Sequence, residues 1–344
     1  MKSIILIHPY FGKLPNFFYF WLESCATNTT INFLIITDQD IKSDYPNIRI
    51  INSTLSEVKQ KIEEYVEFTV NLNKPYKLCD FRPIYYKIFS EYLNGYDFWG
   101  YCDNDMILGD IRHFITDEIL NSYDYILGMG HMHLQRLNDP KYEQVWKSSG
   151  CNKKGLTWKE VFTNEENCWF DELPHGVSAQ YFRMHPEKFF SGFTSTGRYF
   201  EACDFKYKDS FIDTFNTYSV YPTSMYKIGA KEFPFWTRKQ TDDLRNIVYI
   251  KQGNKLYKAG ICNHGVKYEE ILYAHFYKRK LHIHTTNTHN YIIRPNAFIK
   301  MKQITPKRLY WYKYHPELIL DRYYTKIKNR LNKYFHFHLK SILR

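Results

Sequence analysis

Two aspartates at positions i and i+2 follow a strongly apolar segment and could bind a divalent metal ion. Asp103 and Asp105 come directly after residues 96–101, which read Tyr-Asp-Phe-Trp-Gly-Tyr. Side chains alternate between the two faces of an extended strand, so both carboxylates can point the same way while Asn104 points elsewhere. Mg²⁺ and Mn²⁺ prefer oxygen ligands and are often held by one or two carboxylates together with substrate phosphates. The pattern therefore predicts metal-assisted binding of a phosphorylated ligand at a strand end, where open α/β sheets place their ligands.

Strands and helices alternate along the segment that would position these carboxylates. Apolar runs and helical spacing predict strands at 4–7, 31–36, 48–51 and 96–101, and helices at 17–25, 55–68 and 84–93. Ser53 or Thr54 is the expected N-cap of the helix at 55–68. The alternation predicts an α/β fold, with a parallel sheet and helices on both of its faces. Further along we expect strands at 123–128, 177–183 and 219–226, a hairpin at 246–259, and loops with a few short helices at 130–167.

Composition and missing motifs narrow the class of protein. A chain of 344 residues with 44% hydrophobic residues can bury one large or two smaller cores. Its seven cysteines are scattered and form no Cys-x-x-Cys pair, which favours reduced thiols in a cytoplasmic protein over a zinc site or a disulfide framework. The sequence has no Gly-x-Gly-x-x-Gly after the first predicted strand and no Gly-x-x-x-x-Gly-Lys-Ser/Thr, the two glycine-rich motifs that bind phosphates. Phosphates would therefore be held by a metal ion and basic side chains. No segment is long and apolar enough for a transmembrane helix, and residues 4–7 suit a strand better than a signal peptide.

The net charge of +11 is concentrated at the C-terminal end. Residues 300–344 contain twelve Lys and Arg residues but only two acids, Glu317 and Asp321, so residues 1–299 are close to neutral. We therefore divide the chain into a body at 1–299 and a basic, aromatic, helical extension at 300–344. Cations interleaved with aromatics are typical of a helix on an anionic membrane. The alternatives are a solvated helix packed on the body and a nucleic-acid-binding segment, and the neutral body argues against nucleic acid.

Five short segments, taken in order, resemble a known family. They are Pro9-Tyr10-Phe11-Gly12, Thr37-Asp38, Lys77-Leu78-Cys79-Asp80-Phe81-Arg82-Pro83, Trp99-Gly100-Tyr101-Cys102-Asp103-Asn104-Asp105 and Ala274-His275-Phe276-Tyr277-Lys278-Arg279-Lys280. Over roughly residues 1–280 the chain resembles bacterial polysaccharide-biosynthesis glycosyltransferases of the GT-A fold. More distantly it is similar to the retaining lipopolysaccharide galactosyltransferases and glycogenin. The resemblance implies a GT-A-like nucleotide-diphospho-sugar transferase fold, in which a mixed, mainly parallel sheet is flanked by helices. It also implies a UDP-sugar donor, and a glycan or lipid-linked acceptor in surface polysaccharide synthesis.

The resemblance also implies a metal site. Asp103 and Asp105 match the Asp-x-Asp that holds a metal ion against the donor diphosphate, and His275 matches a late histidine that adds a third ligand. The ion would be Mn²⁺ or Mg²⁺, and an imidazole ligand favours Mn²⁺. Without the resemblance, a lone histidine such as His275 would be read as a packed or solvated ring.

Basic and polar residues are expected to bind the donor. Lys278 and Lys280, together with Arg279, would supply cations for the leaving diphosphate, and the sequence does not choose among the three. Lys77, Asp80 and Arg82 match positions that contact the nucleotide-sugar, whereas the structural alternative is an Asp80–Arg82 ion pair capping a helix. Tyr10 could stack on the base beside Thr37 and Asp38; its alternative role is core packing.

A second pair of acids, Asp171 and Glu172, provides the catalytic candidates. It matches the region where related enzymes bind donor-sugar hydroxyls, and where an inverting enzyme would keep its general base. The alternative is a solvated turn, and the stereochemistry of transfer stays open. Two other functions remain for the whole chain: a non-catalytic carbohydrate-binding protein and a nucleic-acid-binding protein that uses the basic extension.

Overall fold

The computed structural model describes most of the chain and divides it into two compact units. Side chains are described for residues 1–128, 130–148, 155–171, 176–190, 244–276, 281–321, 323–324, 326–328 and 330–331, and backbone strands for 201–204, 217–218, 222–228 and 231–236. Unit 1 comprises Met1–Asn104, Asp110–Phe200 and Tyr221–Thr237, and unit 2 comprises Asp105–Gly109, Glu201–Val220 and Arg238–Arg344. The predicted boundary at residue 300 is a different division and stays a prediction.

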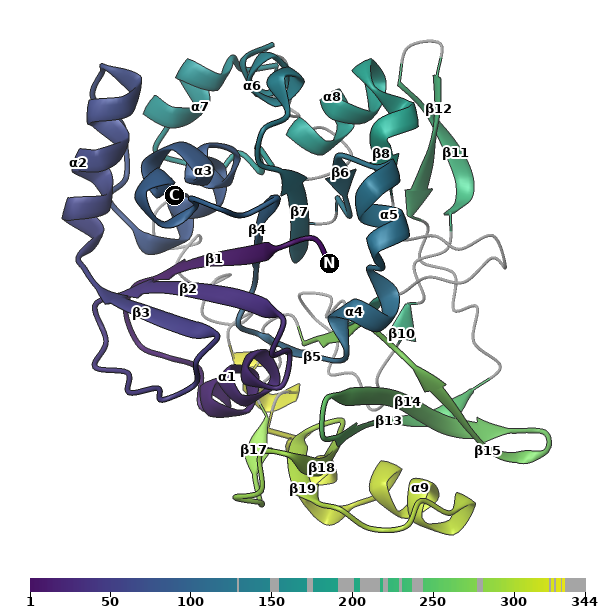
Figure 1. Ribbon diagram of the computed structural model, residues 1–344. Helices are drawn as coiled ribbons and strands as arrows, with labels where there is room; N and C mark the ends of the chain where they lie inside the picture. The colour runs from purple at the N-terminus through teal and green to yellow at the C-terminus, as the bar shows by residue number, and fades with distance from the viewer. Residues whose placement is uncertain are drawn as a thin grey trace, which may run out of the picture. The chain divides into compact units, whose positions relative to one another are not determined.

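Unit 1 contains a seven-stranded mixed sheet with the order β3-β2-β1-β4-β7-β6-β8 (Figure 1). The strands are β1 (Ile4–Tyr10), β2 (Ile31–Thr37), β3 (Ile48–Asn52), β4 (Phe98–Cys102), β6 (Tyr125–Ile126), β7 (Met132–Arg136) and β8 (Phe189–Phe190). Strands β3, β2, β1 and β4 run parallel, β7 is antiparallel to both neighbours, and β6 pairs in parallel with β8. This pairing agrees with the predicted mixed, mainly parallel sheet. A separate antiparallel hairpin consists of β11 (Pro222–Ile228) and β12 (Lys231–Trp236).

Helices pack on both faces of this sheet. They are α1 (Phe18–Ala26), α2 (Leu55–Val66), η1 (Pro75–Ile84), α3 (Tyr85–Ile88), η2 (Ser90–Tyr92), α4 (Ile111–Phe114), α5 (Asp117–Ser122), α6 (Pro140–Lys147), α7 (Trp158–Thr163), α8 (Val177–Met184) and η3 (Pro186–Lys188). Ile5 and Ile7 of β1 share a buried cluster with Ile62 of α2. On the opposite face of β1, the ring of His8 lies 4.8 Å from that of Trp21 in α1. The continuous apolar run of β1 therefore reflects a strand buried on both faces.

Several predicted elements changed type or were missed. The helix expected at 84–93 is a succession of short turns, η1, α3 and η2, in which Pro83 cannot donate a helical hydrogen bond. The strand expected at 177–183 is wrong, because the segment forms α8. Its buried residues Val177, Ser178 and Tyr181 lie at helical spacing, i, i+1 and i+4. Strand β7 lies where loops and short helices were expected. Of the strand expected at 219–226, residues 219–221 lie outside the described chain and the rest belongs to β11.

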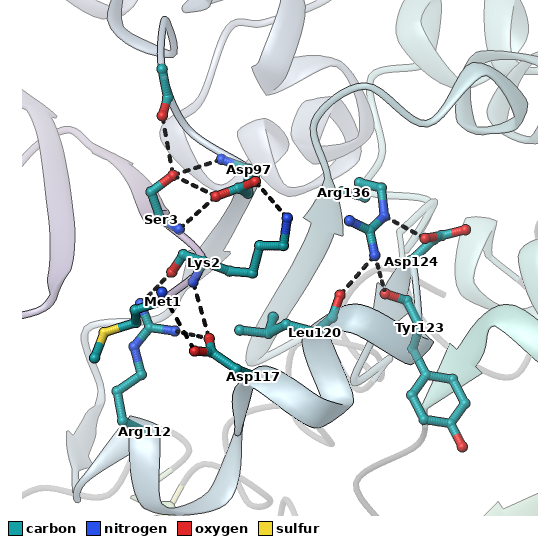
Figure 2. A network of polar contacts seen from close by, with 11 residues as sticks. Met1, Lys2, Ser3, Asp97, Arg112, Asp117, Leu120, Tyr123, Asp124 and Arg136 are labelled. Atoms are coloured by element: carbon teal, nitrogen blue, oxygen red, sulfur yellow. Dashed lines mark hydrogen bonds and ion pairs between the residues drawn. The ribbon is translucent and has the colours of Figure 1, made fainter.

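A polar network fixes the start of β1 beside the turn that precedes β4 (Figure 2). The backbone N–H and the hydroxyl of Ser3 donate to Asp97 Oδ2 at 2.8 and 2.9 Å, and Lys2 Nζ donates to Asp97 Oδ1 at 3.0 Å. Arg112 of α4 donates to the carbonyl of Lys2 at 2.6 Å. The hydrogen bonds from Ser3 and Lys2, with that of the Ser3 N–H the largest effect, lower the pKa of Asp97 to about 2. The network ties β1 to β4, the strand that leads to Asp103.

Unit 2 contains two further sheets. A six-stranded sheet has the order β15-β14-β13-β18-β19-β17, and a four-stranded sheet has the order β10-β9-β16-β5. The elements are β5 (Met106–Leu108), β9 (Glu201–Asp204), β10 (Thr217–Tyr218), β13 (Arg245–Gln252), β14 (Lys255–Cys262), β15 (Gly265–Glu270), β16 (Tyr273–His275), β17 (His282–Ile283), β18 (Asn290–Arg294), β19 (Ala297–Lys300) and α9 (Pro306–Lys313). Strands β13 and β14 confirm the predicted hairpin.

The first helix of the predicted extension is part of the core of unit 2. Leu309 and Tyr312 of α9 pack with Val248, Ile250 and Ile292 from the six-stranded sheet. The described residues between 316 and 331 are also helical. No helix in the described part of the chain has the length and apolar character required to cross a bilayer.

Candidate active site

Asp105 and His275 are brought together by strand pairing within unit 2. Strand β5 pairs antiparallel with β16, so that His275 lies opposite Met106. The backbone N–H of Phe276 donates to the carbonyl of Asp105 at 2.8 Å. This register places His275 Nε2 3.0 Å from Asp105 Oδ1, with the histidine only 2% exposed. A histidine far away in the sequence therefore meets the second carboxylate of the Asp-x-Asp.

Asp103 lies at the end of β4, one residue before the chain passes from unit 1 to unit 2. Its backbone N–H donates to the carbonyl of His131 at 2.8 Å. Only Asn104 separates it from Asp105, and consecutive Cα atoms are 3.80 Å apart, so covalent geometry alone keeps the two Cα atoms within about 7.6 Å. Asp103, Asp105 and His275 form a group that could hold one metal ion. Two carboxylates and one imidazole suit Mn²⁺ better than Mg²⁺, because Mg²⁺ strongly prefers oxygen.

Arg82 of η1 connects the two groups of acids in unit 1. Its Nη1 donates to Asp171 Oδ2 at 2.9 Å and to the carbonyl of Gly130 at 2.6 Å, and its Nη2 pairs with Asp103. The guanidinium carbon also lies 4.7 Å from the centre of the Tyr101 ring. Burial acts to lower the pKa of Arg82, but neighbouring negative groups, Asp103 foremost, raise it well above its ordinary value. A permanent cation is thus fixed beside the first carboxylate of the Asp-x-Asp.

Asp171 is a buried carboxylate with one oxygen available. Oδ2 accepts from Arg82, whereas Oδ1 is buried and has no hydrogen-bond partner among the described residues. Burial raises the pKa of Asp171 and the guanidinium of Arg82 opposes that rise. The carboxyl is 2% exposed and is therefore not part of a solvated turn. Its neighbour Glu172 lies outside the described residues.

Lys77 and Asp80 form a fully buried ion pair that holds the segment leading to Asp171. Lys77 Nζ donates to Asp80 Oδ2 at 2.8 Å and to the carbonyls of Val161 and Glu166. Asp80 in turn accepts the backbone N–H groups of Cys168 and Phe170, at 2.8 and 3.1 Å. The ion pair between Asp80 and Arg82 that the sequence offered as an alternative is not formed, since each pairs with another residue. The donor contact predicted for Lys77 and Asp80 stays a prediction, and their observed contacts are within the protein.

Trp169 lies between the two N–H groups that Asp80 accepts, and it was not among the predicted site residues. Its φ of 53° is a backbone conformation that residues other than glycine rarely adopt. Its side chain is nevertheless 49% exposed. A bulky residue in this conformation is commonly found at functional sites, where the surrounding contacts hold it. The aromatic and acidic residues next to Trp169 in the sequence could have indicated that it belongs to the site.

The predicted base-binding residues gather at neighbouring ends of β1 and β2. Tyr10 is paired with Thr37 in the parallel ladder, and the backbone N–H of Gly12 donates to Asp38 Oδ1 at 2.9 Å. The Tyr10 hydroxyl donates to the carbonyl of Lys13 at 2.8 Å, so the ring is held across the loop and only partly buried. Hydrogen bonds from Gln39 and Gly12 lower the pKa of Asp38. This arrangement brings the predicted residues together, and their contact with a base stays a prediction.

The predicted phosphate-binding lysines cannot be placed. Lys278 and Lys280, together with Arg279, lie outside the described residues, which resume at Leu281. The described candidates therefore comprise the Asp105–His275 pair in unit 2, and in unit 1 the Asp103–Arg82–Asp171 chain and the ends of β1 and β2.

Comparison with known proteins gives a family and distant similarities to solved structures. No curated protein sequence matches the chain at a significant level. Mouse xyloside xylosyltransferase 1, in its apo form, is a similar solved structure with 9% sequence identity and a TM-score of 0.33, covering 59% of this chain and 87% of that chain. Similarity at that level carries no argument about activity. Residues 6–302 match a family described as "Family of unknown function (DUF6625)". Because the match spans most of the sequence, the chain belongs to the DUF6625 family.

Proposed function

We propose that this protein is a metal-dependent glycosyltransferase of the GT-A type that transfers a sugar from a UDP-sugar to a glycan or lipid-linked acceptor. The observation that carries the proposal is the Asp105–His275 pair, whose Oδ1 and Nε2 atoms are 3.0 Å apart. Asp105 directly precedes β5, and His275 lies on the adjoining strand β16. Asp105 is the second aspartate of the Asp-x-Asp that follows a buried strand. If Asp103 and Asp105 only formed a solvated turn, we would not expect a buried histidine from a distant strand beside Asp105. An oxygen and nitrogen ligand set of this kind fits a metal ion that binds a diphosphate.

The described residues would divide the work of transfer among them. A bound metal ion would neutralise charge on the departing nucleoside diphosphate. Asp103, Asp105 and His275 would hold that ion, and the guanidinium of Arg82 would add positive charge beside Asp103. Asp171, whose Oδ1 has no partner among the described residues, would accept a hydrogen bond from a sugar hydroxyl or take the proton of the acceptor. In the first case Asp171 orients the donor, and in the second the product has inverted configuration.

The proposed setting is the cytoplasmic side of a membrane, in surface polysaccharide synthesis. Scattered cysteines without a pairing pattern favour a reducing compartment. The basic extension offers a means of approaching a lipid-linked acceptor. Both points support the proposal from the sequence, and neither depends on the metal site.

Calorimetric titration of UDP tests the donor site directly. We expect the wild-type protein to bind UDP with Mn²⁺ and to lose at least tenfold in affinity in EDTA. Asp105→Asn keeps the shape of the side chain but removes the charge, so it should weaken UDP binding to a similar extent. Asp44→Asn, which changes an exposed acid elsewhere in the chain, is the matched control and should bind like the wild type.

Two results would contradict the proposal. The first is UDP binding that is indifferent to both the metal ion and Asp105. The second is a complete lack of binding to UDP under conditions where the protein binds free glycans, which would favour the carbohydrate-binding alternative. If metal-dependent UDP binding is found, release of UDP from a panel of UDP-sugars would identify the donor.

A further inference from the structure

Large apolar side chains form an exposed stripe on the C-terminal segment, residues 316–331, whose described residues are helical. Leu320, Tyr324, Ile327 and Leu331 are 68%, 70%, 56% and 50% exposed. Their spacing of four, three and four residues places them on one face of a helix. Tyr323 adjoins the stripe and is 64% exposed. Apolar side chains scattered singly over a surface need no explanation, whereas a contiguous exposed stripe marks an interaction site.

The beginning of this segment is attached to the strands of unit 2. Leu318 is fully buried. Glu317 pairs with Arg294 and accepts from His284 Nε2 at 2.8 Å. Asp321 accepts from Asn296 Nδ2 at 2.8 Å, and His282 Nε2 lies 3.1 Å from its Oδ2. These contacts hold residues 317–321 against unit 2, and the side chains of the stripe from Tyr324 onward lie beyond them and are exposed.

These contacts also show which charged side chains of the segment are paired with unit 2 and which are exposed. Glu317 and Asp321 are the only acids in residues 300–344, and both face the strands of unit 2. Lys326, Lys328 and Arg330 are exposed near the stripe. The sequence showed that the extension is basic, but the structure adds that its two negative charges are turned inward. The exposed part of the segment therefore combines apolar side chains with positive charge, while the two acids are paired with residues of unit 2.

Helix α9 adds aromatic side chains to the exposed surface of the extension. Trp311 and Tyr314 are 56% and 55% exposed, although Leu309 and Tyr312 of the same helix are buried. Tryptophan and tyrosine favour the boundary between headgroups and acyl chains, where the ring is in an apolar environment and its polar edge remains hydrated. We call the exposed stripe and its neighbouring cations the tail face.

We propose that the tail face docks on the surface of an anionic lipid bilayer. The apolar stripe would enter the boundary of the acyl chains, and Lys326, Lys328 and Arg330 would lie among the headgroup phosphates. An unbroken helix over residues 316–331 would be about 24 Å long, shorter than the ~30 Å hydrocarbon core, so it would lie in the plane of the interface. Charge complementarity selects an anionic bilayer over a neutral one. The inference goes beyond the proposed transferase activity and does not depend on it.

Flotation with lipid vesicles tests the proposal on the full-length protein. Wild-type protein should float with vesicles containing 30% phosphatidylserine and remain unbound with phosphatidylcholine alone. Ile327→Glu/Leu331→Glu should abolish most of the binding. Lys326→Glu/Lys328→Glu should weaken it at least 25-fold, since each cation near an anionic surface contributes on the order of fivefold. Raising the salt concentration should weaken the binding of the wild type.

Matched controls separate the tail face from general charge and solubility effects. Tyr268→Glu introduces an acid at a 49% exposed aromatic of β15 and should leave vesicle binding unchanged. Lys42→Glu/Lys74→Glu makes the same change in net charge at exposed lysines of unit 1 and should also bind like the wild type. Equal losses in the control and tail-face variants would overturn the proposal.

Two other occupants of the tail face are outcomes that would also overturn it. If the stripe joins two copies of this chain, Ile327→Glu/Leu331→Glu would convert a dimer to a monomer in light scattering, and the wild type would not float with anionic vesicles. If the cations bind nucleic acid, the protein would retard RNA or DNA on a gel while ignoring the vesicles. Metal-dependent UDP binding is measured separately, so a failure of the tail-face proposal remains distinguishable from a failure of the proposed activity.

Discussion

At the scale of single residues, the most informative contacts are the hydrogen bonds that Asp80 forms within the protein. Asp80 was predicted to touch a donor, yet in the structure it accepts the N–H groups on both sides of Trp169. It thereby fixes the backbone immediately before Asp171. Lys77 balances its charge within the protein, where both side chains are 0% exposed. The pair therefore supports the shape of the site, whatever ligand the site binds.

Replacing Asp80 by asparagine should destabilise the protein strongly. Asp80→Asn keeps the size of the side chain but leaves Lys77 as a buried, unpaired charge, which typically costs about 3–5 kcal/mol. We expect that loss in the free energy of unfolding measured with urea. Glu91→Gln is the matched control, because it breaks the exposed Lys61–Glu91 pair and should cost less than about 1 kcal/mol. Equal costs for the two variants would show that the Lys77–Asp80 pair is not buried as described.

At the scale of elements, strand β5 decides whether the second aspartate meets its histidine. The backbone N–H of Gly109, directly after β5, donates to the carbonyl of Leu272 at 2.7 Å. Lys251 Nζ donates to the carbonyl of Leu108 at 2.5 Å. These contacts hold β5 in register with β16, the strand of His275. The geometry of the pair is therefore a property of a strand register as well as of two residue types.

A methyl group at Gly109 should disturb that register. A Cβ atom at this position would lie 2.4 Å from the carbonyl oxygen of Ile271 and 3.1 Å from that of Leu272, so the backbone of β5 must shift. We expect Gly109→Ala to weaken Mn²⁺ binding at least tenfold in titrations followed by electron paramagnetic resonance. Gly260→Ala in β14, whose Cβ would meet its nearest atoms at 3.0–3.1 Å, should have a smaller effect. Unchanged Mn²⁺ affinity in a folded Gly109→Ala protein would argue against the Asp105–His275 site.

The elements also show why parts of the fold could not be predicted. Strand β7 was missed because buried His133 and Gln135 alternate with its apolar residues and hide the usual pattern of a strand buried on both faces. The strand predicted at 177–183, where the structure has α8, was wrong for the converse reason, since a helix resembled a strand in sequence. Val177, Ala179 and Tyr181 alternate as in a strand, but burial of Ser178 beside them shows the helical face. In both cases a buried polar residue misled a pattern based on hydrophobicity.

At the scale of the whole molecule, the chain is divided into two units that are both assembled from separate stretches of sequence. Residues Asp105–Gly109 leave unit 1, contribute β5 to unit 2, and the chain then returns to unit 1 at Asp110. The Asp-x-Asp therefore lies at a crossing between the units along the chain. The basic extension belongs to unit 2 and shares its core through α9.

The stability of the protein should fall in two separate pH windows. Burial lowers the pKa of His133 to about 4, so between about pH 6.5 and 4 the unfolded chain binds a proton that the folded protein does not. Stability is therefore lost as the pH falls through this window, by about 3 kcal/mol in total. The pKa of Asp97 is lowered to about 2, so its contribution is present above about pH 4 and is lost as the pH falls toward 2.

Two substitutions separate the windows in urea unfolding experiments at a series of pH values. His133→Asn should flatten the dependence between pH 6.5 and 4, and Asp97→Asn should flatten only the dependence below pH 4. The comparison uses slopes against pH, so a general loss of stability in either variant does not affect it. An unchanged slope in His133→Asn would mean that this histidine is protonated in the folded protein.

The sequence by itself determined the first four parallel strands, the position of the Asp-x-Asp after the last of them, the hairpin of β13 and β14, and the basic character of the extension. These features depend on local apolar runs and local charge, which residues close in sequence encode. Only the tertiary structure decided that His275 meets Asp105, that Asp80 holds the segment before Asp171, and that Glu317 and Asp321 turn inward. Each of these contacts joins residues that are distant in the chain, and strand register and helix orientation, which follow from the packing of whole units, determine which of them face each other.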